Sequence, residues 1–229
     1  TPGTSLVIRA VICCRSAKGT SSTVAVMASL VLTARMMTGH SKERLSSRTP
    51  VDLKSGTTVK YCHTYGVKLH VTLNTLVYEN EYGELFDSLK QICEAGADAV
   101  IVQDLAVFDY IVNNFEDLEA HCSTQMGLDD LEGTLLYKGL GAKRVVLSRE
   151  VPMEKVKEIK RIAQIPIEIF VHGALCVSYS GNCLMSGLIG YRSGNRGRCV
   201  GSCRKPYELI DTTTGKSLGG FRPDILQTV

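Results

Sequence analysis

Between residues 61 and 175 the sequence alternates short apolar runs, rich in β-branched residues, with longer amphipathic runs. An apolar pattern of period two predicts a strand, whereas a pattern of period 3.6 predicts a helix. Glycine or proline marks most of the turns, which is typical of helix ends and starts. The repetition predicts an α/β fold with a parallel sheet. We expect strands at residues 68–76, 98–105, 119–126, 142–150 and 165–173, and helices at residues 81–96, 106–115, 130–141 and 152–163.

The predicted strands recur every roughly 20 to 30 residues, which suits either part of a (β/α)8 barrel or an open doubly wound sheet. No G-x-G-x-x-G motif follows any of them, which counts against a dinucleotide-binding sheet. We therefore expect an incomplete TIM-type barrel over residues 58–175. A Cys- and Gly-rich segment, residues 176–217, is expected at the C-terminal end of the last clear strand.

Polar residues stand where each predicted strand ends. In a TIM-type barrel these ends form the active face. His172 directly follows the last strand, so it is a candidate general acid or base, with a structural role as the alternative. The polarity also has a plainer explanation, because loops are generally polar. The candidates for catalysis are His172, Gln103, Gln125, Arg149 and Glu150, and Asn74 is a candidate for substrate binding.

Residues 172–207 contain four cysteines and five Arg or Lys residues, but no Asp or Glu. The cysteines are spaced C-x6-C-x15-C-x3-C, unlike the paired C-x2-C knuckles of most structural zinc sites. The many glycines let backbone N–H groups approach cluster sulfides, and nearby arginines lower thiol pKa values. This favours a 4Fe–4S cluster, with zinc, unliganded thiols and disulfides as alternatives. The candidate ligands are Cys176, Cys183, Cys199 and Cys203.

The positive charge of the same segment suggests a second role. It could form the rim of a pocket for an RNA base, bind an anionic organic acid, or only balance the charge of a cluster. The candidates for substrate binding here are Arg192, Arg196, Arg198 and Arg204.

The composition limits where such a chain works. Nine cysteines, an odd number unevenly spread, indicate a reducing cytoplasm with metal-binding thiolates rather than a secreted disulfide scaffold. Cys62, Cys93 and Cys122 lie in helix or strand patterns or beside aromatics, so we expect small core residues there. No apolar run reaches the roughly 18 residues that would span a bilayer.

The two ends of the chain differ from its middle. Residues 1–57 contain no aromatic residue and only two acids, and they show neither period clearly. We expect an atypical leader that is disordered or results from a frameshift, and an atypical tail at residues 218–229.

The segment "EIFVHGALCVSYSGNCLMSGLIGYRSGNRGRCVGSCRKPYEL" resembles the signature of the collagenase-like peptidases, peptidase family U32. Upstream, "VTLNTL", "GADAVIVQDL", "STQM" and "RVVLSRE" resemble the barrel strands of the family, so the likeness runs from about residue 58 to about residue 217. The family's opening strand and first repeat are not found. Within the family, the chain resembles the members that hydroxylate tRNA uridine and ribosomal RNA cytidine.

This resemblance implies hydroxylation of an RNA base that depends on an iron–sulfur cluster and on prephenate. It also implies that the four cysteines are cluster ligands, although family members differ in where the last one lies. The alternatives are a collagenase-like peptidase, a noncatalytic cluster-carrying or RNA-binding subunit working with a protein partner, and oxygen-independent hydroxylation of a quinone precursor. The sequence contains no HExxH or P-loop motif, so metal-dependent hydrolysis and nucleotide-driven chemistry lack a signature.

Overall fold

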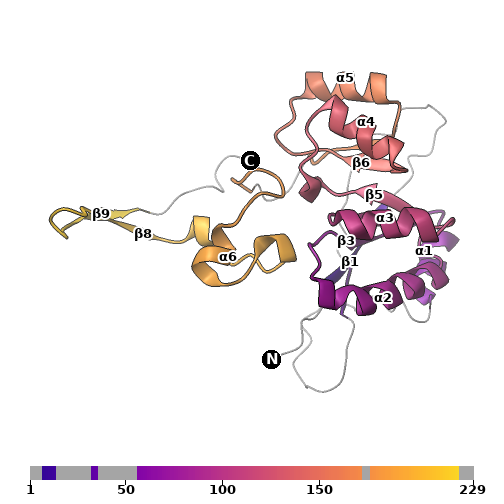
Figure 1. Ribbon diagram of the computed structural model, residues 1–229, viewed down its shortest axis with the longest axis horizontal. Helices are drawn as coiled ribbons and strands as arrows, with labels where there is room; N and C mark the ends of the chain where they lie inside the picture. Colours follow the sequence, from indigo (N-terminus) through magenta and orange to yellow (C-terminus); the bar gives the residue numbers. More distant parts are fainter. Residues whose placement is uncertain (1–6, 14–31, 36–55, 172–175, 222–229) are drawn as a thin grey trace, which may run out of the picture.

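A seven-stranded sheet organises the part of the chain described by the computed structural model, which comprises residues 7–13, 32–35, 56–171 and 176–221 (Figure 1). The strand order is β2-β1-β3-β4-β5-β6-β7. Strands β3 to β7 are parallel, whereas β1 is antiparallel to both β2 and β3. The strands are β1 (Val7–Cys13), β2 (Leu32–Arg35), β3 (Lys68–Leu73), β4 (Ala99–Val102), β5 (Glu119–Cys122), β6 (Arg144–Val146) and β7 (Ile167–Glu168).

Helices connect the parallel strands, and their ends follow from local chemistry. The Asp104 carboxylate accepts hydrogen bonds from the backbone N–H groups of Ala106 and Val107, and this fixes the start of α3. Asp130 does the same for α4 through Gly133. The helices of this unit are α1 (Thr57–Thr64), α2 (Tyr82–Glu94), α3 (Leu105–Asn114), α4 (Leu131–Gly139) and α5 (Met153–Ala163).

The expected alternation of five parallel strands with four helices is confirmed. The five strands lie in the sheet in the order in which they occur in the chain, as they do in a β/α barrel, rather than reversing at a switch point. The sheet is thus consistent with part of a barrel. Within this sheet and its helices, the sequence analysis did not predict α1 or the strands β1 and β2, which lie within residues 1–57. The rest of residues 1–57 and of the tail lies outside the described residues.

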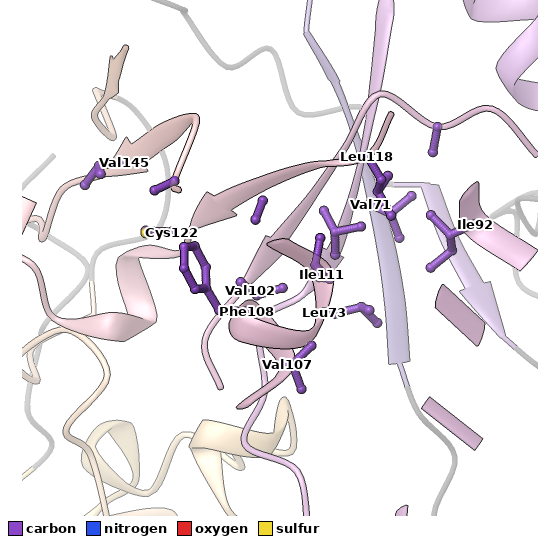
Figure 2. Close-up of a cluster of buried hydrophobic side chains, with 14 of the residues drawn as sticks. Val71, Leu73, Ile92, Val102, Val107, Phe108, Ile111, Leu118, Cys122 and Val145 are labelled. Carbon is purple, nitrogen blue, oxygen red and sulfur yellow. The ribbon is translucent and has the colours of Figure 1, made fainter. Parts of the chain in front are cut away.

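One face of the sheet packs against the helices and forms the hydrophobic core (Figure 2). Val71, Val102 and Cys122 represent alternate positions of β3, β4 and β5, and they meet Phe108 and other residues of α3. Cys62 and Cys122 are buried in this cluster and Cys93 packs against it, which confirms the expected core positions. Burial raises the pKa of the Cys122 thiol to about 12, so this thiol is a packing group rather than a ligand.

The opposite face carries polar side chains from alternate positions of the same strands. His70 of β3 and His121 of β5 are both buried, with ring centroids 4.8 Å apart in an edge-to-face arrangement. Arg144 lies opposite His121 in the register, and its Nη1 is 3.5 Å from Oε2 of the buried Glu168 on β7. In a barrel these positions would line the interior, which would then be ionisable rather than purely aliphatic.

Burial dominates the electrostatics of this face. It lowers the pKa of His70 to about 3, and the nearby His121 and Arg144 act in the same direction, outweighing Asp98 and Glu119. Burial also raises the pKa of Glu168 above its ordinary value despite Arg144. The hydrogen bond from His121 instead lowers the pKa of Glu119 to about 2.

No helix among the described residues combines the length and apolar character needed to cross a membrane.

The pKa of His70 makes stability dependent on pH. Because the folded-state pKa of about 3 lies below the ordinary value of 6.5, the native state binds fewer protons than the unfolded state between these values. The free energy of unfolding should therefore fall as the pH drops from 6.5 towards 5, and His70→Gln should flatten this slope. Urea denaturation at a series of pH values between 7 and 5 measures the slope of the unfolding free energy against pH. Equal slopes in the two proteins would contradict this assignment, since His121 alone would then account for the dependence.

Candidate functional site

A cysteine segment, residues 176–207, follows β7 and contains α6 (Met185–Gly190) and the short 3-10 helices η3 (Gly194–Arg196) and η4 (Ser202–Arg204). The hairpin of β8 (Tyr207–Ile210) and β9 (Ser217–Phe221) comes next and extends away from the sheet (Figure 1). Few apolar side chains of the segment are buried, whereas Val177, Leu184 and Leu188 are exposed. The segment is therefore held mainly by polar contacts.

Arg149, just beyond the end of β6, makes the densest set of these contacts. Its Nη1 donates to the Cys176 carbonyl at 2.9 Å, its Nη2 to the Ser178 carbonyl at 3.0 Å and its Nε to the Ser180 hydroxyl at 3.2 Å. A planar guanidinium can satisfy three acceptors at once because its donors point in fixed directions. Arg149 therefore holds the start of the cysteine segment at the C-terminal end of the sheet.

Ser180 and Glu150 complete this contact. Ser180 is only 1% exposed, and its backbone N–H donates to Glu150 Oε1 at 3.0 Å. Its hydroxyl accepts from Arg149 and donates to the same carboxylate oxygen at 3.3 Å. Nη2 of Arg149 is 3.7 Å from that oxygen. The two predicted catalytic residues after β6 thus form one hydrogen-bonded network with a serine that sequence analysis did not single out.

The ends of β4 and β5 approach the same loop. The Gln103 side chain is buried, and its Nε2 donates to the Gln125 carbonyl at 3.2 Å. Gly181, at φ +77°, packs so closely on Gln125 that a Cβ atom there would lie 2.0 Å from the same carbonyl oxygen. The Tyr179 hydroxyl donates to Asp129. Gln103, Gln125, Arg149 and Glu150 are therefore brought together, as expected of residues at the ends of neighbouring parallel strands.

A second anchor lies at Arg196. Its guanidinium forms a bidentate ion pair with Glu81, with N–O distances of 2.5 and 2.8 Å, and donates to the Leu76 carbonyl at 2.8 Å. Its Cζ lies 4.2 Å from the centre of the Tyr78 ring. The hydrogen bond from Arg196 holds the pKa of Glu81 below its ordinary value. Arg196, predicted to bind substrate, here ties η3 to the chain that follows β3.

The four candidate ligands are free thiols, of which Cys176 and Cys199 are exposed and Cys183 and Cys203 are half-buried. A Cβ atom at Gly194 would lie 3.7 Å from the Cys199 Cβ and 4.0 Å from the Cys183 carbonyl, so these two stretches approach each other. The Gly201 N–H donates to the Cys199 sulfur at 3.3 Å.

Within the described residues, however, no three His, Cys, Asp or Glu side chains are grouped closely enough to hold a metal ion. The donor set fits a cluster or zinc in its chemistry, because it offers thiols, an N–H···S contact and nearby cations. The four sulfur atoms are not gathered around one point, and their ligand role remains a prediction.

The other predicted site residues are distributed around this centre. Asn74 follows β3 and is half-buried, while Arg192, Arg198 and Arg204 are exposed on the cysteine segment. His172 lies outside the described residues. The residues that sequence analysis missed are the docking partners Ser180, Glu81 and Tyr78. Arg196 and Glu81 are 115 positions apart, so no local pattern relates them.

Comparison with known proteins fits this arrangement. The model of peptidase family U32 matches residues 43–226. The chain belongs to this family. Membership confirms the resemblance found in the sequence, and it covers both the parallel sheet and the cysteine segment that docks on it.

The U32 relatives include RNA-modifying proteins and a protease. The chain is 37% identical over 153 residues to the 23S rRNA 5-hydroxycytidine C2501 synthase of Escherichia coli (strain K12), covering 67% of this chain and 23% of that protein. It is 36% identical over 154 residues to tRNA hydroxylation protein P1 of Bacillus subtilis (strain 168), covering 67% and 36%. It is 32% identical over 168 residues to a collagenase of Porphyromonas gingivalis (strain ATCC BAA-308 / W83), covering 69% and 40%. The chain thus spans less than half the length of these curated relatives.

Among solved structures, the U32 peptidase Mk0906 aligns with a TM-score of 0.45 and 17% identity, over 55% of this chain and 54% of the other.

Two glycines of the cysteine segment offer a matched test of its docking. Gly181 and Gly197 both have left-handed backbone angles, but a Cβ meets nothing within 4 Å at Gly197. Gly197→Ala should cost about 1 kcal/mol from backbone strain alone. Gly181→Ala should cost more and should loosen the segment, because its Cβ collides with the Gln125 backbone. Urea denaturation and the rate of tryptic cleavage at Arg192 and Arg198 measure the two effects. Equal behaviour of the two variants would show that Gly181 does not dock as described.

Proposed function

We propose that this chain is part of an enzyme that hydroxylates an RNA base, acting in the cytoplasm on tRNA or ribosomal RNA. The observation that carries the proposal is the docking of an acid-free, arginine-bearing cysteine segment onto the C-terminal ends of parallel strands. Strand ends are where barrel enzymes build their sites. Relatives named as RNA hydroxylation proteins support the choice of reaction.

Cys176, Cys183, Cys199 and Cys203 would hold a 4Fe–4S cluster, with zinc as the alternative. When bound, such a cluster supplies electron transfer. The free thiols, the N–H···S contact at Cys199 and the absence of acids from residues 172–207 support this donor set. Prephenate is the proposed co-substrate, and its carboxylates suit the exposed guanidinium groups of Arg192, Arg198 and Arg204.

The residues at the strand ends would position the substrate and the segment. Arg149 and Glu150 fix the loop that begins at Cys176, so their part is orientation. Gln103 donates to Gln125 through its amide nitrogen, while its buried Oε1 has no hydrogen-bond partner among the described residues. This oxygen would accept a hydrogen bond from an unpaired base, whose edges carry N–H donors. Asn74 and His172 are the remaining candidates for substrate contact.

The full protein would extend what this chain contains. We propose that the five parallel strands belong to a TIM-type barrel, because they lie in the sheet in chain order. A protein partner could supply electrons or a further ligand.

Peptidase activity is the second candidate, favoured by 32% identity to a collagenase. A cysteine protease needs a thiolate paired with a base. The described histidines lie elsewhere: His63 pairs with Asp98, and His70 and His121 are buried against each other. The base of such a peptidase would therefore be His172, four residues before Cys176 in the sequence.

Analysis of modified nucleosides in a deletion strain tests the main proposal. The intact gene should restore a hydroxylated base, Cys183→Ala should reduce it at least tenfold, and Cys93→Ala should leave it unchanged because Cys93 packs against the core outside the segment. Anaerobically purified protein should hold about four irons and four sulfides per chain, and Cys183→Ala should lose them. A hydroxylated base that persists in Cys183→Ala would refute the proposal, as would gelatin cleavage by a protein that leaves RNA unmodified. Zinc in place of iron would make the site structural.

A further inference from the structure

Tyr191, at the end of α6, is 94% exposed, more than any other large apolar side chain of the described residues. Its backbone has φ 52° and ψ 25°, the left-handed region that glycine normally occupies at a helix end. Among the described residues only Gln164 shares a positive φ without being glycine. A bulky residue in this conformation costs about 1 kcal/mol or more. The backbone at Tyr191 is therefore strained, and the aromatic ring that it carries is exposed to solvent.

Ser186 holds this strained turn in place. Its carbonyl accepts from the Tyr191 N–H, and its hydroxyl donates to the Arg192 carbonyl at 2.6 Å. The same hydroxyl accepts from the Val200 N–H at 3.1 Å. Val200 directly follows Cys199, so one buried serine fixes both the turn that carries Tyr191 and the turn that carries a candidate ligand. The backbone that carries the ring is thus fixed to the cysteine segment rather than lying on a loose loop.

The surroundings of Tyr191 are apolar and cationic. Leu184 and Leu188 are 64% and 75% exposed, and the Leu188 N–H donates to the Leu184 carbonyl at 3.0 Å, so the two leucines lie one turn apart. Tyr191 follows at the C-terminal end of the same short helix. Arg192 and Arg198 are exposed nearby in sequence, and residues 172–207 contain no acid. We call Leu184, Leu188, Tyr191 and Arg192 the α6 platform.

We propose that the α6 platform binds single-stranded RNA and that Tyr191 stacks on an unpaired base. This inference rests on the proposed function and names the surface by which the substrate is bound. Aromatic side chains on a positively charged groove are the usual means of binding single strands, because every base has a π-face and every nucleotide a phosphate. Local charge favours this polyanionic occupant over a protein partner, whose surface would carry both signs. A base stacked on Tyr191 would lie next to the turn of Cys199.

The test measures RNA binding directly. Fluorescence anisotropy would follow the 229-residue chain binding a labelled single-stranded oligonucleotide of about twelve nucleotides, with a duplex of the same sequence for comparison. Tyr191→Ala should weaken binding to the single strand by roughly tenfold or more, because stacking is lost. Tyr191→Phe should retain it. Tyr191→Gly should bind as weakly as Tyr191→Ala yet unfold at higher urea, because glycine relieves the left-handed strain.

Tyr65→Ala is the matched control, since Tyr65 is 68% exposed beside α1, outside the cysteine segment. It should bind RNA as the wild type does. Unchanged binding by Tyr191→Ala, or an equal loss in Tyr65→Ala, would overturn the inference. So would a wild-type chain that binds no RNA, or a Tyr191→Ala effect confined to self-association.

The outcome is separable from that of the proposed function. If Tyr191→Ala binds RNA normally while the hydroxylated base still depends on Cys183, the inference fails and the function stands. If Tyr191 is needed for RNA binding but no hydroxylated base depends on this gene, the inference stands and the proposed function fails.

Discussion

The hydrogen bonds from the Arg149 guanidinium are the interaction on which the site depends. The cysteine segment buries few apolar side chains, so it lacks the hydrophobic contacts that hold α2 to α5 on the sheet. Three donors of one side chain replace them by fixing the carbonyls of Cys176 and Ser178 and the hydroxyl of Ser180. Arg196 provides the second tether, through Glu81. Both arginines act within the chain, which leaves Arg192, Arg198, Arg204 and Lys205 as the exposed cations of the segment.

The polar face of the sheet is the other constraint. Four ionisable side chains, those of His70, His121, Arg144 and Glu168, are held where a barrel would enclose them. Burial keeps His70 largely neutral, with a pKa of about 3, and raises the pKa of Glu168. Burying such groups costs stability, and buried ionisable groups are often found at functional sites. This face of the sheet is therefore consistent with a role in a site rather than in packing alone.

Much of the fold could be predicted because strands and helices leave periodic patterns. The five parallel strands and the helices between them followed from those periods, and the polar strand ends identified Gln103, Gln125, Arg149 and Glu150. The last strand ends at Glu168 rather than near residue 173, because it pairs with only two residues of the short β6. Strands β1 and β2 lack a clear pattern, since the pairing of β1 with β3 and of β2 with β1 depends on backbone groups rather than on side-chain period. Contacts such as Arg196 with Glu81 join distant residues and leave no mark in the sequence.

Hydrogen exchange of the cysteine segment tests the central claim, that Arg149 docks it onto the strand ends. The Ser180 and Asn182 amides donate to Glu150 and to the Tyr179 carbonyl, so they should be protected in the wild type. In Arg149→Lys a single ammonium cannot reach three acceptors, and these amides should exchange at least tenfold faster, while the Phe108 amide of α3 keeps its protection. Unchanged exchange at Ser180 and Asn182 would contradict the account, because the segment would then be held without Arg149.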